Sequence, residues 1–303
     1  MSALAPRHWI WISAAMLAAL AAAGLLATQF GKSDQFLRLR AISGYYRVYE
    51  YNQVVRSNDQ ADGQSKTVKT NCEIIYQGRG MQTGGVLAPL IRVGRGEVQI
   101  DGLPRKDAFP RLREDMPTDF LGRPVALDGR PAPYSLEMLS SPDFFPFLSG
   151  RRTRPGEEWE HQFRLEIPRA ALPMIVVMRT RLDGFQLTDS EWLSQISFRA
   201  HGEVLYRAAD GAAEQAKLEI QGQSRWNAEI GMPYSLKCNL ILRVYDFEKT
   251  RLAPQLAANP NFAVKRLRMA DTTLTLLRKT QPSRHSADRR SAATPAGDGG
   301  SLF

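Results

Sequence analysis

Apolar and polar residues alternate one by one along long stretches of this chain, and this two-residue period constrains its fold more than any other feature. From Trp159 to Ile167, every second residue is apolar or a histidine, and the residues between are charged or amides. Successive side chains of a β-strand point to opposite faces, so a strand with one buried and one wet face has this pattern. The sequence therefore predicts strands that contribute one face to a core.

The same alternation of apolar and polar residues recurs along the chain and predicts nine or ten antiparallel strands. The expected strands cover residues 45–55, 68–76, 86–93, 97–100, 158–167, 174–182, 192–206, 214–226, 234–245 and 272–277. We expect residues 94–96, Gly-Arg-Gly, to form a turn between two strands, and the short strand 272–277 to close the sheet. The fold class is all-β and mainly antiparallel: a curved sheet, half barrel or sandwich.

An apolar stretch without charged residues, from Trp9 to Phe30, precedes the strands. Its length suits a membrane-spanning helix, and its small residues also suit a cleaved signal peptide. We therefore assign residues 1–31 to a signal anchor or signal peptide. Residues 32–278 form an extracytoplasmic β domain, anchored at the inner membrane or exported after cleavage.

A proline-rich excursion interrupts the strand pattern at residues 101–134. It has six prolines and many charges, and loops of this length inside a domain are usually functional or disordered. It is a candidate lid or partner-binding loop, or a surface excursion without a role. The following cluster, Phe144, Phe145, Phe147 and Leu148, is expected to plug one end of the core.

Positive charge is concentrated towards the C-terminus. The chain has a net charge of +9, and eight basic and two acidic residues lie between Lys265 and Arg290. We expect residues 279–303 to be a disordered basic tail, which either binds an anionic polymer or lipid or is simply solvated. Nucleic acid is not an expected partner, because no aromatic residues are interleaved with these basic ones.

The two cysteines, Cys72 and Cys238, lie far apart in the sequence within strand-like runs. This spacing excludes a close-spaced metal knuckle or a redox pair. In an oxidising compartment they could form a disulfide between distant strands. The alternative is two buried, unreacted thiols.

No pattern in the chain indicates catalysis or a bound cofactor. A nucleophile elbow is absent, and so are the glycine spacings of phosphate-binding loops. Of the four histidines, His161 and His201 are the pair that could share a site, whereas zinc usually needs three or four ligands. We therefore expect no catalytic residues, no metal and no cofactor.

A weak resemblance concerns Gly156 and Trp159 at one strand entry, and the hairpin from Gly202 to Gly211 with Val204 and Tyr206. In these positions the chain resembles a loose group of uncharacterised exported bacterial β-rich proteins. A curved antiparallel sheet is also similar to the half barrel of lipoprotein carriers, whose concave apolar face holds acyl chains. The resemblance implies a fold and no activity.

These observations predict a non-enzymatic, membrane-tethered domain of the cell envelope. Its expected partner is a protein or polymer bound at a sheet edge or at the proline-rich segment, besides the membrane contacted by residues 9–30. The alternative is a lipid or hydrophobic-ligand carrier, with Trp159, Phe163 and Leu165 as its apolar ligand face.

Overall fold

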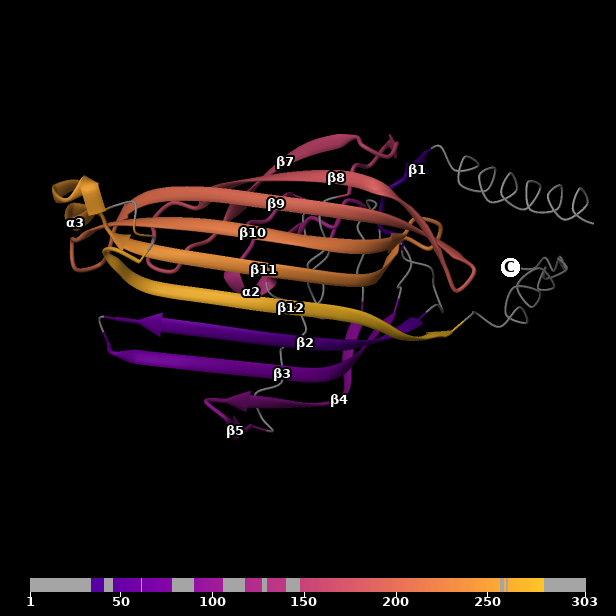
Figure 1. Cartoon of the computed structure of the whole chain (residues 1–303), viewed down its shortest axis with the longest axis horizontal. Coiled ribbons are helices and arrows are strands. Elements are labelled where there is room, and N and C mark those ends of the chain that lie inside the picture. Colours follow the sequence, from indigo (N-terminus) through magenta and orange to yellow (C-terminus); the bar gives the residue numbers. More distant parts are fainter. Residues whose placement is uncertain are drawn as a thin grey trace, which may run out of the picture.

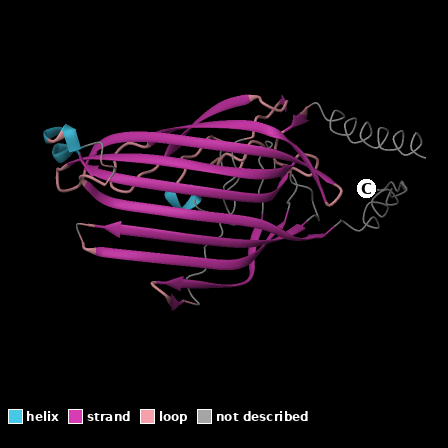
Figure 2. Ribbon diagram, in the orientation of Figure 1, coloured by secondary structure: helices cyan, strands magenta, loops and turns pink. Residues whose placement is uncertain are grey.

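A computed structural model describes residues 34–40, 46–60, 62–77, 90–105, 118–126, 130–139, 148–256, 259 and 261–280. This part is mainly antiparallel β structure, as the sequence predicts (Figures 1 and 2). The strands are β1 (Gln35–Phe36), β2 (Tyr46–Asp59), β3 (Gln64–Gln77), β4 (Leu90–Ile100), β5 (Leu103–Pro104), β6 (Arg152–Thr153), β7 (Glu158–Leu165), β8 (Met174–Thr188), β9 (Glu191–Arg207), β10 (Ala213–Asn227), β11 (Met232–Asp246) and β12 (Val264–Thr280). The helices are α2 (Leu136–Leu139), α3 (Phe247–Leu252) and the 3-10 turn η1 (Pro254–Leu256).

Ten strands form one open sheet in the order β5-β4-β3-β2-β12-β11-β10-β9-β8-β7. Strands β7 to β11 follow one another as a meander, and β2 to β5 form a second meander. Strand β12 lies between the two and pairs with both β11 and β2. The expectation that a short strand 272–277 closes the sheet is therefore wrong: this strand is longer and central.

The hairpin β2–β3 is present, with Cys72, Ile74 and Tyr76 buried on one face as their alternation predicts. The turn predicted at residues 94–96 is instead part of the continuous strand β4. Glu73 pairs with Arg95 and Ile74 with Val93, so Gly94 is an extra residue in a β-bulge. Closely spaced glycines are compatible with a bulge as well as with a turn. In this chain β4 pairs with β3 on both sides of Gly94, so the glycines form a bulge.

One face of the large sheet supplies most of the hydrophobic core, and we call it the inner face. Large side chains such as Trp226, Tyr49 and Tyr51 are almost completely buried there. Leu37, Leu121, Tyr134, Leu139 and Leu148, which lie outside the large sheet, belong to the same core. Residues 118–126 and 130–137, which include the second half of the proline-rich excursion, thus pack on the core, and we call them the strap. Residues 101–105, at the start of the excursion, are exposed. Phe144, Phe145 and Phe147 of the predicted plug lie outside the described residues.

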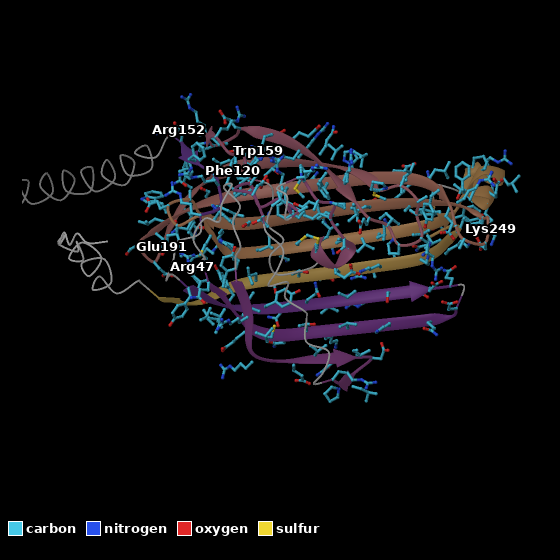
Figure 3. All side chains as sticks on the ribbon, turned by 180° about the vertical axis from the view of Figure 1, so that it is seen from behind. Arg47, Phe120, Arg152, Trp159, Glu191 and Lys249 are labelled. Carbon is cyan, nitrogen blue, oxygen red and sulfur yellow. The ribbon has the colours of Figure 1, made fainter. Side chains whose placement is uncertain are left out.

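The sheet is strongly curved at the end where β2, β9 and β11 begin. The Nη2 atom of Arg47 on β2 lies 3.4 Å from the Glu191 carboxylate on β9, although three strands separate β2 from β9 (Figure 3). Four strand spacings in a flat sheet would amount to about 19 Å. The Arg47 guanidinium and the Tyr49 hydroxyl also donate hydrogen bonds to the Pro233 carbonyl. These contacts tie the rolled sheet together.

The expectation of a disulfide between Cys72 and Cys238 does not fit this sheet. Both cysteines are free and buried, on β3 and β11. Strands β2 and β12 lie between them, which places them about 14 Å apart at ordinary strand spacing. A disulfide requires Cα atoms closer than about 7 Å. The alternative of two buried thiols describes the structure.

We expect neither thiol to react with Ellman's reagent at pH 8 in the native protein, and both to react after denaturation. Burial raises the pKa of Cys72 to about 11, and burial together with the charge of Asp271 raises that of Cys238 to about 12. The reactive thiolate is therefore scarce as well as shielded. Thiol counting before and after adding guanidinium chloride, without reductant, checks this. A count of zero in denaturant would show a disulfide.

The predicted leader at residues 9–30 lies outside the described residues, and so does the tail beyond Thr280. Strand β12 continues to Thr280, so the tail begins later than the predicted residue 279. Within the residues that the structure describes, no helix is both long and apolar enough to span a membrane.

Candidate functional site

The best candidate site is a groove of about 980 Å³ beside β7, at one edge of the sheet. Its walls come from four segments: the second half of β7, the strap residues 123–124, the strap residues 130–137, and the loop 166–173 between β7 and β8. We call it the edge groove. Both features that the sequence suggests for partner binding, a sheet edge and the proline-rich segment, meet in it.

Strand β7 has an incompletely paired outer edge. Tyr134 of the strap pairs with it through two backbone hydrogen bonds, from the Tyr134 N–H to the Arg164 carbonyl and from the Glu166 N–H to the Tyr134 carbonyl. Ala132, two residues before Tyr134, has its backbone groups in the same orientation. Its N–H donates to the Pro124 carbonyl and not to β7. The strap therefore leaves the edge after one bridge, because Pro131 and Pro133 on either side of Ala132 disfavour a regular strand.

Beyond this bridge, no described segment pairs with the outer backbone groups of β7. Along a strand, the backbone N–H and C=O groups of successive residues point alternately to one side and to the other. Since the Arg164 carbonyl points outward, the backbone groups of Gln162 point outward too. Among the described residues, no backbone hydrogen bond reaches Gln162 from that side. The edge groove thus contains the donor and acceptor pair that an added strand requires.

The side chains of the edge groove combine apolar surface with charges of both signs. The apolar lining includes five prolines and Leu172, which is 71% exposed. Three arginines, Arg123, Arg130 and Arg164, and two acids, Glu137 and Glu166, contribute the charge. Arg123 is held by Asp119 through a 2.7 Å ion pair, whereas Arg164 is exposed and has no ion-pair partner among the described residues. An apolar segment that carries a carboxylate would suit this lining.

The predicted apolar ligand face lies on the inner side of β7. Phe163 and Leu165 are buried, and Trp159 is half-buried against the same core. The Phe163 ring lies 4.8 Å from the Tyr134 ring, centroid to centroid. The protein's own strap therefore contacts the surface that the carrier hypothesis assigned to a ligand.

The two histidines considered for a metal site lie on opposite faces of the sheet. His161 is half-buried on the inner side, where its Nε2 atom is 3.3 Å from the Leu148 carbonyl. His201 is exposed on the outer face. Burial lowers the pKa of His161, opposed by the hydrogen bond to Leu148. In the described part of the chain, no group of three or more His, Cys, Asp or Glu residues could hold a metal ion.

Sequence reasoning singled out the sheet edge and the proline-rich segment separately, but not their meeting at Tyr134. The one available signal was the sequence PAPY, in which alternating prolines precede an aromatic residue. This pattern favours an extended segment that cannot continue as a paired strand. It does not indicate which strand Tyr134 contacts.

No protein-family model, no curated protein and no solved structure matches this chain.

Proposed function

We propose that this protein is a non-enzymatic, membrane-tethered domain of the cell envelope that binds an extended segment of a partner protein in the edge groove. The observation that carries the proposal is the outward backbone edge of β7 at Gln162, which lies beside an apolar groove and pairs with no other described segment. Peptides that add a strand to a sheet gain affinity from main-chain hydrogen bonds and specificity from pockets for alternate side chains. The edge groove offers both.

Charge indicates the chemistry of the partner. Arg164 stands beside the free edge without an ion-pair partner among the described residues. A carboxylate of the bound segment would supply that partner, and the adjoining prolines and Leu172 would contact apolar side chains. We therefore favour an apolar segment with an acidic residue. The carrier alternative gains no comparable support, because Tyr134 already packs on Phe163.

The first test places a photo-crosslinking residue at Leu172 in the full chain, expressed in its own host. A matched control places it at Leu252 on α3, which is 75% exposed and distant from the groove in the chain order. We expect an envelope protein to crosslink at Leu172 and not at Leu252. Absence of any adduct at Leu172, or the same adduct at both positions, would contradict the proposal.

Replacing Gln162 with Pro in the Leu172 crosslinking protein should reduce the adduct about tenfold, which corresponds to loss of about one main-chain hydrogen bond. Proline is tolerated on an edge strand where its missing N–H faces outward, so β7 should keep its pairing with β8. The control Gln162→Ser removes the same side chain and keeps the N–H. Equal crosslinking of the two variants would show that strand addition does not occur.

A further inference from the structure

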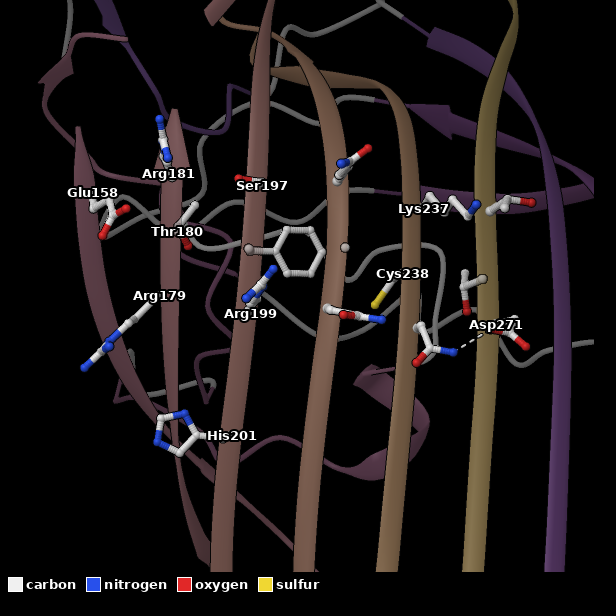
Figure 4. Close-up of a pocket in the computed structure, with 17 residues that line it drawn as sticks. Glu158, Arg179, Thr180, Arg181, Ser197, Arg199, His201, Lys237, Cys238 and Asp271 are labelled. Carbon is white, nitrogen blue, oxygen red and sulfur yellow. Dashed lines mark hydrogen bonds between the residues drawn. The ribbon is translucent and has the colours of Figure 1, made fainter. Parts of the chain in front are cut away.

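A second groove crosses the outer face of the sheet, on the side opposite the hydrophobic core. It has a volume of about 800 Å³ and extends over strands β8 to β12, with Glu158 of β7 at one end (Figure 4). Four strand spacings give it a length of about 19 Å. We call it the outer groove. It is separate from the edge groove and from the proposed peptide.

Cross-strand register explains its shape. One wall is a row of neighbouring side chains on five strands: Arg179, Arg199, Gln221, Asn239 and Asp271. The other wall is the row two residues along each strand: Arg181, Ser197, Gln223, Lys237 and Thr273. Between the rows, the inward-facing residues present their backbone, which forms the floor.

Gly222 lies at the middle of that floor. The Phe198 ring occupies the space on the core side of Gly222, where a Cβ atom would overlap it. The aromatic ring thus supports the floor from beneath without narrowing the groove. In the second wall, the short side chain of Ser197 stands between Arg181 and Gln223.

Positive charge in the outer groove is only partly neutralised. Arg179 lies directly opposite Arg199 on the neighbouring strand, an arrangement of like charges that destabilises a sheet. Glu160 accepts from Arg179 at 3.1 Å, but no described residue forms an ion pair with Arg199 or Lys237. These two cations flank β10 on either side (Figure 4).

The two acids that line the groove, Glu158 and Asp271, lie at its opposite ends and do not neutralise them. Glu158 lies opposite Arg181 on the neighbouring strand. Asp271 accepts a 2.6 Å hydrogen bond from the Asn239 side chain and lies 3.9 Å from Arg56. Both contacts hold its charge at the β12 side. The centre of the groove, over β9 to β11, therefore keeps an excess of positive charge.

Between Arg199 and Lys237 lie uncharged groups that can donate and accept hydrogen bonds. Gln221 and Gln223 on β10 lie between Arg199 and Lys237. The remaining wall residues include an amide, Asn239, and the hydroxyls of Ser197 and Thr273. Side-chain amides and hydroxyls hydrogen-bond readily to a polyol, and arginine and lysine bind carboxylate or phosphate. We propose that the outer groove binds a linear anionic glycan laid across the strands.

The test uses the full chain in detergent with a fluorescent decamer of galacturonic acid, and measures binding by anisotropy. Matched probes are a neutral dextran oligosaccharide, inorganic polyphosphate and phosphatidylglycerol vesicles. We expect the galacturonate decamer to bind, to bind more weakly as salt rises, and to bind better than the other three probes.

The variant R199Q/K237Q should weaken binding of the galacturonate decamer about tenfold or more, because it removes the two groove cations that no described acid neutralises. Its control, R207Q/K249Q, makes the same charge change at exposed residues of β9 and α3, outside the groove. Both replaced groove residues are exposed, so the variant should fold normally. Equal weakening by the two variants, tighter binding of polyphosphate, or binding to vesicles alone would overturn the proposal.

Discussion

Replacing Arg47 with Met is expected to lower the free energy of unfolding by about 3 kcal/mol, at the low end of the range for breaking a buried ion pair. The Arg47 side chain is completely buried, and it binds both the Glu191 carboxylate and the Pro233 carbonyl. The replacement removes the buried positive charge beside Glu191, whereas the Pro233 carbonyl keeps the hydrogen bond from the Tyr49 hydroxyl. Because 18% of the Glu191 side chain remains exposed, water can compensate part of the loss.

Chemical denaturation at pH 7, monitored by tryptophan fluorescence, measures the loss. Arg56→Met is a suitable control, since Arg56 and Asp271 are more than half exposed and lie 3.9 Å apart. An exposed pair contributes at most about 1 kcal/mol, so this control should change little. If both variants lost the same stability, the Arg47 contacts would not hold the rolled sheet together.

Strand periodicity was enough to predict the fold class because alternation is a local property. It placed Phe163 and Leu165 on the inner face of β7, and it placed Cys72 and Ile74 correctly on β3. It could not predict which strands are neighbours, since pairing depends on contacts between distant parts of the chain. The disulfide hypothesis failed for this reason: two strands separate Cys72 from Cys238.

Strand β12 shows a second limit of local patterns. Near the start of β12, Arg266 and Arg268 occupy positions that face the core. Apolar residues there would have given the alternating pattern that predicts a strand. The segment therefore resembled the beginning of a basic tail. Only the buried partner of Arg266, Glu214 on β10, explains why a cation faces inward there. The candidate grooves were unpredictable for the same reason, because cross-strand pairing creates them.

The Glu214 cluster joins three strands at the end of the sheet near α3. Glu214 is buried and accepts hydrogen bonds from the Tyr206 hydroxyl at 2.8 Å and from Lys265 at 3.1 Å. Arg266 donates to Glu214 at 2.5 Å and to the Tyr206 hydroxyl at 2.7 Å. Since Lys265 and Arg266 belong to β12, this cluster fixes the central strand to β9 and β10.

Protonation of Glu214 is coupled to these contacts. Burial by itself would raise the pKa of Glu214, but the hydrogen bonds from Tyr206 and Lys265 and the positive charges of Arg266 and Lys265 lower it below its ordinary value. Burial and the hydrogen bond to Glu214 raise the pKa of Tyr206 to about 12, which keeps its hydroxyl protonated as a donor. The ionised carboxylate is therefore the form that the fold stabilises.

Glu214→Gln should cost about 2 to 3 kcal/mol of stability at pH 7, because it leaves Lys265 and Arg266 without their buried counter-charge. A lowered pKa in the folded state gives a contribution that is complete above the unfolded value of 4.5 and lost as pH falls through the folded pKa. The stability difference between wild type and variant should thus shrink below pH 4.5. Denaturation curves from pH 3 to 7 measure it, with Glu203→Gln as a control because that side chain is 55% exposed. A difference that stayed constant across this range would show that the charge of Glu214 does not hold β12 in the sheet.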